Sequence, residues 1–164
     1  MEYFCYPCGM DRQVTPVTAL NRIEWLTDLI RLEITLWERI DRRLRDEHGL
    51  SLAFFEALYF IGQTSDGSLR VGDLSRALRV TVGGTSKLAD RIEAAGLIRR
   101  EVPADDRRAS RLVLTPDGQR KLAAASQTYD AELATVLDAA LSSEEQHLLH
   151  DRVVHLLSAD DGSS

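Results

Sequence analysis

The sequence of 164 residues has the length of one ordinary domain, and its 44% hydrophobic content suffices to bury a core without disulfide bonds. No apolar run approaches the roughly 18 residues that a membrane span requires, which excludes a membrane protein. The chain starts without the basic and apolar stretches of a secretory signal, so a cytoplasmic location with reduced cysteines is expected.

The charge of the chain is unevenly distributed. The net charge is −6, which by itself argues against a polyanionic partner. Between Arg70 and Lys121, however, twelve Lys and Arg stand against seven Asp and Glu, a local charge of +5, and the remainder carries −11. This pattern indicates one basic segment suited to nucleic acid, flanked by segments with another task.

A long amphipathic helix is predicted between Val17 and Arg45, because apolar residues recur every three or four positions. Gly49 suits the left-handed position after a helix, and at about 1.5 Å per residue the helix would reach roughly 40 Å. This length favours dimerisation; the alternative is a helix that lies across its own core. The apolar positions are Leu20, Ile23, Leu26, Ile30, Ile34, Trp37, Ile40 and Leu44.

Three shorter helices are expected next. Ser51 is a good N-cap for a helix that stops at residues 64–67, and a short helix follows over residues 71–78. Thr81 caps a third helix, which Gly96 closes. Two short helices in quick succession predict a helix-turn-helix.

Two strands are predicted at residues 97–102 and 110–114, and residues 103–108 join them in a hairpin with a charged tip. Thr115 and Pro116 then restart a helix, with a cap and a first-turn proline. Ser142 and Glu145 form the capping box of the last helix. The expected fold is mainly α with a small β-hairpin wing, a winged helix-turn-helix with N- and C-terminal dimerisation helices.

In such an arrangement the second helix of the helix-turn-helix enters the major groove of DNA and the hairpin reaches the neighbouring backbone or minor groove. Thr81, Thr85 and Ser86 offer hydroxyl groups, and Lys87 offers a cation, at the start of that helix. Gly83 and Gly84 each cost about 1 kcal/mol of helix propensity relative to Ala. They indicate either a close approach of the backbone to another surface or a frayed helix start.

Four motifs follow one another along the basic segment of the chain: Val71–Ser75, Ser86–Arg100, Asp105–Ala109 and Leu114–Gly118. In the order and spacing of these motifs the chain resembles the MarR family of bacterial transcriptional regulators. The resemblance covers residues 17–157 as one domain, with an arm at 1–16 and a tail at 158–164. Within it, 17–48 and 116–157 are expected to be dimerisation helices and 51–115 the DNA-binding lobe.

The resemblance implies a homodimer that binds a near-palindromic operator on double-stranded DNA, usually as a repressor, and responds to a small phenolic or other aromatic effector. Asp106 and Arg108 fall on the family's Asp-x-Arg wing motif, and Arg107 would lie beside phosphate. Residues 82–84 depart from the usual polar or basic pattern, which puts base readout there in doubt. The DNA-binding residues implied are Thr81, Val82, Gly83, Gly84, Thr85, Ser86, Lys87, Arg91, Asp106, Arg107 and Arg108.

The resemblance also places an effector pocket between the dimerisation helices and the DNA-binding lobe. Trp25, Leu29, Phe55, Tyr59 and the start of the helix after Thr115 would line it. For each of these residues, ordinary core packing is the alternative.

Cys5 and Cys8 have the C-x-x-C spacing of redox pairs and of half a zinc site. A thiol-based redox regulator is therefore one alternative function, beside a packed or disordered N-terminal arm and a metal site completed by distant ligands. A winged-helix protein-interaction module without DNA binding is another, because of the net charge and the double glycine. No catalytic triad, phosphate loop or metal-ligand motif occurs, so no enzyme activity, metal or cofactor is expected.

Overall fold

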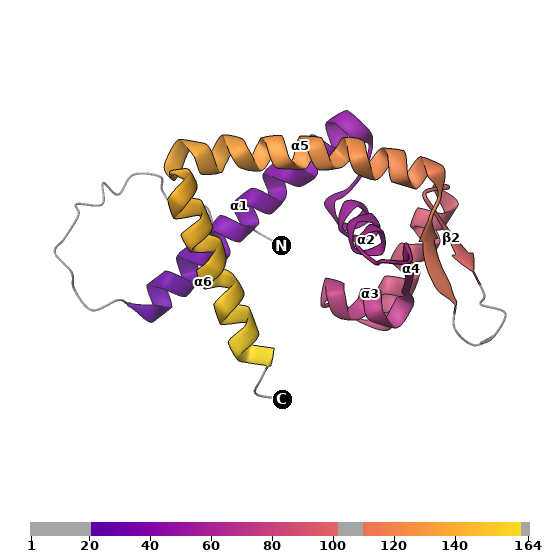
Figure 1. Cartoon of the computed structure of the whole chain (residues 1–164), viewed down its shortest axis with the longest axis horizontal. Coiled ribbons are helices and arrows are strands. Elements are labelled where there is room, and N and C mark those ends of the chain that lie inside the picture. The colour runs from indigo at the N-terminus through magenta and orange to yellow at the C-terminus, as the bar shows by residue number, and fades with distance from the viewer. Residues whose placement is uncertain (1–20, 102–109, 162–164) are drawn as a thin grey trace, which may run out of the picture. The chain divides into compact units, whose positions relative to one another are not determined.

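The computed structural model describes residues 21–101 and 110–161 (Figure 1). The chain divides into two compact units, Met1–Ile34 and Thr35–Ser164, and the boundary falls within the first helix. No helix among the described residues is long and apolar enough to cross a membrane. The elements, in chain order, are α1 (Arg22–His48), α2 (Leu52–Gly62), β1 (Ser68–Arg70), α3 (Val71–Leu78), α4 (Val82–Ala94), β2 (Ile98–Glu101), β3 (Arg111–Leu114), α5 (Pro116–Ala140) and α6 (Ser143–Asp161).

The described part of the first unit is the beginning of α1. The Asn21 side-chain oxygen accepts hydrogen bonds from the backbone N–H groups of Ile23 and Glu24, at 3.2 and 3.4 Å, and so caps the helix. The helix was expected from Val17, and residues 17–20 lie outside the described residues. Apart from Asp28, every residue of this part is exposed in the single chain.

The second unit begins with the rest of α1 and turns sharply into α2. Gly49 adopts φ +63°, the left-handed conformation predicted for it, and the N–H of Leu50 returns to the carbonyl of Leu44 at 3.2 Å. Ser51 caps α2, as its side chain accepts from Phe54 N–H. Asp41 adds a second acceptor, 2.7 Å from Leu52 N, so the end of α1 fixes the start of α2.

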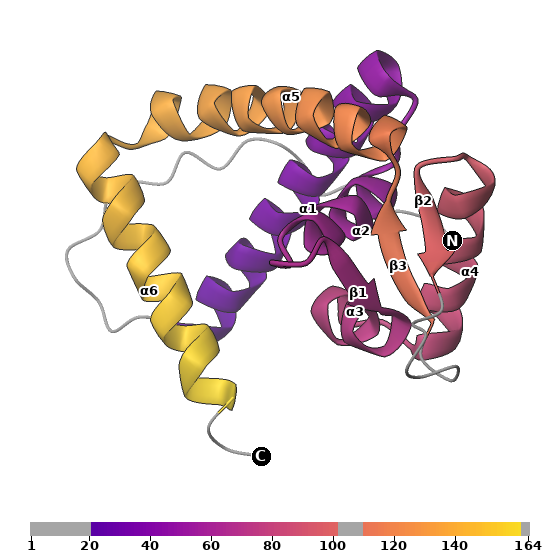
Figure 2. The ribbon, with the colours of Figure 1, turned by 45° about the vertical axis from the view of Figure 1, so that its right-hand side comes forward.

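The sheet has three antiparallel strands in the order β1-β3-β2, one strand more than the predicted hairpin (Figure 2). Strand β1 pairs Ser68 with Val113 and Arg70 with Arg111. Both predicted strands are present as β2 and β3, whereas β1 was not predicted, because its three residues are too few to show an alternating pattern. Strand β1 forms only through its pairing with β3, which lies about forty residues further along the sequence.

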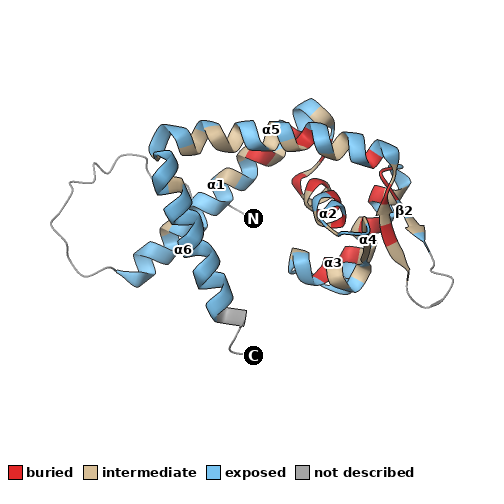
Figure 3. Cartoon of the chain, viewed as in Figure 1, coloured by how far each residue is buried: buried red, intermediate tan, exposed pale blue. Residues whose placement is uncertain are grey.

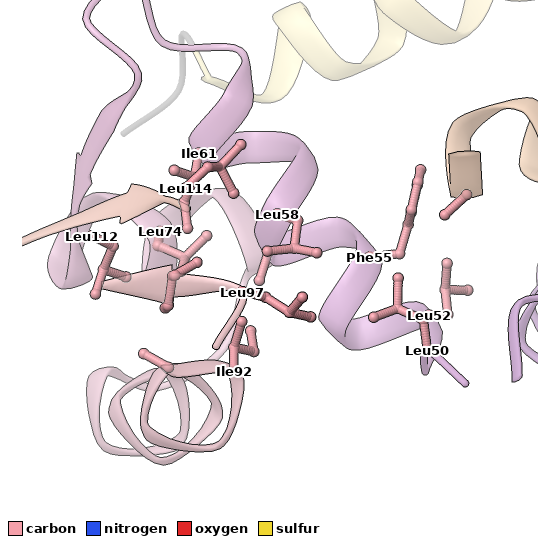
Figure 4. Close-up of a cluster of buried hydrophobic side chains, with 14 of the residues drawn as sticks. Leu50, Leu52, Phe55, Leu58, Ile61, Leu74, Ile92, Leu97, Leu112 and Leu114 are labelled. Carbon is pink, nitrogen blue, oxygen red and sulfur yellow. The ribbon is translucent and has the colours of Figure 1, made fainter. Parts of the chain in front are cut away.

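The core of the second unit joins α2, α3, α4 and the sheet to the end of α1 (Figures 3 and 4). Leu44, Leu58, Leu74, Ile92 and Leu112 are completely buried. By contrast, all but one of the residues of α6 whose burial is described are exposed, and its large apolar side chains lie open along the helix. The elements that carry the winged helix-turn-helix therefore form a complete core, and α6 does not.

The start of α5 is docked on the start of β2. Thr115 caps α5 by accepting from Gly118 N–H at 3.0 Å, and its own hydroxyl donates to the Gly96 carbonyl at 2.7 Å. The Leu97 carbonyl accepts from Thr115 N–H at 3.0 Å. Gly118 is buried directly against that carbonyl, so a Cβ at this position would overlap the Leu97 backbone.

We therefore expect Gly118→Ala to lower the free energy of unfolding by about 1–3 kcal/mol, the usual cost of overpacking. Gly72→Ala is the matched control, because a Cβ on Gly72 in α3 meets nothing within 4 Å. Chemical denaturation of both variants checks this. Equal stability of the two variants would contradict the close contact of α5 with the start of β2.

Candidate functional site

The turn between α3 and α4 is fixed from inside. Helix α3 ends at Arg79, a non-glycine residue in the left-handed conformation with φ 53°. The buried Ser75 hydroxyl donates to the Val80 carbonyl at 2.6 Å, and Thr81 caps α4 by accepting from Gly84 N–H at 3.2 Å. These bonds hold the two helices of the predicted helix-turn-helix in one arrangement.

The first turn of α4 faces outward. Thr81, Val82, Gly83 and Gly84 are exposed, as are Lys87 and Arg91 further along. A Cβ on Gly83 would meet nothing within 4 Å, so no neighbour in the described chain requires glycine there. The first turn is also helical and capped, so the frayed start considered from the sequence is not observed.

Two of the predicted DNA-binding residues are less accessible. Thr85 is completely buried, and its hydroxyl donates to the Thr81 carbonyl at 3.0 Å. Ser86 is half-buried. Thr85 therefore packs inward and supports the cap, a role that its residue type alone does not distinguish from an outward hydroxyl.

Several of the basic side chains in this segment are already paired with carboxylates. Arg79 and Lys87 are exposed and have no ion pair within the described part of the chain, and Arg91 lies over the Phe54 ring at 5.1 Å from its centre. Arg79 was not predicted as a site residue, although a cation two residues before the cap of α4 was the available signal. The pairs are Arg76–Asp73, Arg99–Glu101, Arg100–Asp90, Arg100–Glu93, Arg111–Asp66 and Arg120–Asp117.

The base of the wing is tied to α4. The Glu93 carboxylate accepts from the backbone N–H of Arg100 at 3.0 Å and from its guanidinium at 2.8 Å. At the other strand, Arg111 donates to Asp66 at 2.6 Å and to Ser68 at 2.9 Å. The predicted tip residues Asp106, Arg107 and Arg108 lie outside the described residues, as do Cys5 and Cys8.

A pocket of about 510 Å³ lies between α2 and α5. Two of the residues predicted for an effector pocket, Phe55 and Tyr59, line it, whereas Trp25 and Leu29 belong to the first unit and stay predictions. The expected contribution of the helix after Thr115 comes from further along α5 than its start, and the other lining residues were not predicted individually, because their meeting depends on how α5 packs on α2. They are Glu56, Phe60, Ser126, Tyr129, Asp130 and Leu133.

Aromatic rings and a half-buried carboxyl group set the character of this pocket. Phe55 stacks on Tyr129 with ring centres 5.0 Å apart and on Tyr59 at 6.2 Å. Burial raises the pKa of Glu56, and burial together with the charges of Glu56 and Tyr59 raises the pKa of Tyr129.

Among the described residues, no group of three His, Cys, Asp or Glu side chains could hold a metal ion.

Comparison with known proteins finds one matching family and solved structures of similar fold. Residues 48–109 match the model of the MarR family. The chain is similar to a MarR family transcriptional regulator from Streptomyces coelicolor solved in complex with DNA, at 21% identity over 88% of this chain and 91% of that one, with a TM-score of 0.76. It is 29% identical to a MarR family regulator from Silicibacter pomeroyi over 85% and 95% of the two chains, with a TM-score of 0.69. For S. aureus MepR, also solved with DNA, the identity is 26% over 83% and 96%, with a TM-score of 0.67. The predicted winged helix fold is confirmed.

The half-buried Glu56 gives a pH dependence of stability. Because its pKa in the folded chain lies above the ordinary value of 4.5, ionisation costs stability as the pH rises from that value through the raised pKa. We expect Glu56→Gln to become more stable than the parent chain over this rise and to keep the advantage at neutral pH.

Denaturation at several pH values measures this difference. Glu38→Gln, which removes an exposed carboxylate of α1, is the control. A difference between Glu56→Gln and the parent that stays constant across the pH range would contradict the effect of burial.

Proposed function

The chain belongs to the MarR family, and we propose that it binds a near-palindromic DNA operator as a homodimer and represses transcription until a small aromatic or phenolic effector binds. MarR family proteins are DNA-binding transcription regulators and not enzymes. The observation that carries the proposal is the outward first turn of α4, with exposed cations on both sides of it.

The arrangement of α4 suits the major groove. Its first turn offers backbone N–H groups to phosphate, and Arg79 precedes this turn while Lys87 and Arg91 follow it. We infer that these three cations contact the DNA backbone, because none of them forms an ion pair in the described part of the chain, whereas basic residues such as Arg100 and Arg111 are engaged with carboxylates. The polar contribution to base readout then comes from Thr81 and the partly accessible Ser86.

The wing residues complete the proposed interface. Arg108 would enter the minor groove, where the narrow A·T-rich form attracts an arginine, and Asp106 would orient it. Arg107 would contact phosphate beside it. The bond of Arg100 to Glu93 supports this role, because it fixes the base of the hairpin relative to α4, and the bond of Arg111 to Asp66 ties β3 to the turn before β1.

The exposed apolar surfaces of α1 and α6 support the dimer. Along α6, Leu149, Val153 and Leu156 are 47%, 41% and 55% exposed in the single chain, and in the first unit Ile23 is 81% exposed. Soluble proteins rarely leave such apolar rows open, so we infer that a second copy covers them. A two-fold dimer then presents two copies of α4 to two half-sites, which is why a near-palindromic operator is proposed.

The effector is proposed to occupy the pocket between α2 and α5. Phe55 and Phe54, which lies under Arg91, are neighbours on α2. A ligand that moves α2 would therefore displace a residue in contact with the proposed DNA-binding helix.

Gly83 tests the interface most sharply, because its two expected effects have opposite signs. In the free chain a Cβ at this position meets nothing, so Gly83→Ala should be at least as stable as the parent, by up to about 1 kcal/mol. Against DNA the same methyl group would intrude between the helix backbone and the groove. We expect the affinity for the operator to fall at least tenfold in an anisotropy titration.

Ala94→Ser is the control, since it adds one atom to the exposed last turn of the same helix. It should leave the affinity unchanged. Unaltered binding by Gly83→Ala, measured at the same salt concentration, would remove the first turn of α4 from the interface.

A further inference from the structure

We propose that the pocket between α2 and α5 selects an organic cation, an amine or quaternary ammonium compound that carries an aromatic group. This inference rests on the proposed function only for the consequence of binding; the ligand class follows from the pocket itself. The class is narrower than the aromatic or phenolic effector proposed above, and it disfavours phenolates and aromatic acids.

The first reason is the charge of the lining. Two carboxylates, Glu56 on α2 and Asp130 on α5, line the pocket, and no Lys, Arg or His is among its described lining residues. A bound anion would face two like charges and find no cationic partner there. A cation would be attracted to both.

The second reason is that Glu56 has no partner among the described residues. No hydrogen bond or ion pair joins its half-buried carboxylate to another residue in the described part of the chain. Such a carboxylate costs stability, in line with its raised pKa. A cationic ligand would offset that cost, whereas an anion or a neutral molecule of the same shape would not.

For comparison, another carboxylate on α5 is neutralised by two arginine side chains. Glu132 on α5 is also partly buried, and it accepts from Arg39 at 2.5 Å and lies 3.4 Å from Arg43. These arginines are thus engaged by Glu132. Glu56, by contrast, is a partly buried acid that lines the pocket and has no ion pair in the described part of the chain.

The third reason is the arrangement of rings. Phe55 and Tyr129 stack at an interplanar angle of 18°, and Tyr59, 41% exposed, meets Phe60 edge-on at 5.9 Å. The faces of aromatic rings attract cations, and several rings around an acid form the usual cage for an alkylated ammonium group. The volume of about 510 Å³ suits one ligand of moderate size.

The test compares three probes that share a naphthalene ring and differ in charge: 2-(2-naphthyl)ethyltrimethylammonium, 2-naphthaleneethanol and 2-naphthylacetate. Isothermal titration of the full chain should show at least tenfold tighter binding of the cation than of the anion, with the neutral probe between them. Failure of the cation to bind at millimolar concentration, or equal binding of the three, would overturn the proposal.

Variants of the chain localise the effect. Glu56→Gln should weaken binding of the ammonium probe at least tenfold and leave the neutral probe within twofold. Asp130→Asn, which removes the second carboxylate of the lining, gives an independent reading. Glu38→Gln, remote from the lining, should change nothing. An ammonium affinity that survives both pocket substitutions would overturn the assignment to this pocket.

Operator binding, measured with and without the ammonium probe, separates this inference from the proposed function. Cation-selective, Glu56-dependent binding that leaves DNA affinity unchanged would confirm the ligand class and contradict the effector role. Loss of the selectivity in a chain that still binds its operator would contradict the ligand class alone.

Discussion

The burial of one face of α4 is the constraint on which the rest of the structure depends. Thr85, Ala89 and Ile92 recur at helical spacing and are completely buried, so the opposite face has to point outward. The N-cap at Thr81 and the hydrogen bond from the Ser75 hydroxyl to the Val80 carbonyl then fix where that face begins. Because Glu93 on the same helix binds Arg100 at the base of the wing, helix and hairpin are presented together.

Local charge explains how an acidic chain can approach DNA. The net charge is −6, yet the basic segment concentrates cations around α4 and pairs several of the others with carboxylates. Pairing leaves Arg79 and Lys87 exposed near the first turn, which is where steering and phosphate contact are needed. In the pocket a charge of the opposite sign, the carboxylate of Glu56, is likewise left without a partner among the described residues, at a cost to stability. Both sites use charges that the fold does not neutralise.

The sequence predicted the elements whose limits are set by local chemistry. The caps at Ser51, Thr81 and Thr115 and the box at Ser142 all lie where their residue types indicate. Strand β1, the inward turn of Thr85 and the pairing of α2 with α5 in the pocket depend on contacts between distant segments, so residue type and spacing did not predict them. The family resemblance implied Phe55 and Tyr59 as pocket residues, whereas Tyr129 was not predicted, because its place in the lining depends on the packing of α5 on α2.

The central claim is that the winged helix-turn-helix binds a specific DNA operator, and fluorescence anisotropy of the full chain on its own upstream DNA tests it most directly. The account predicts two chains per duplex, no comparable binding to a scrambled duplex, and an affinity that falls linearly in a log-log plot against salt as counterions are released. Absence of any DNA complex at low salt would contradict the account and favour a protein-interaction module built on the same fold.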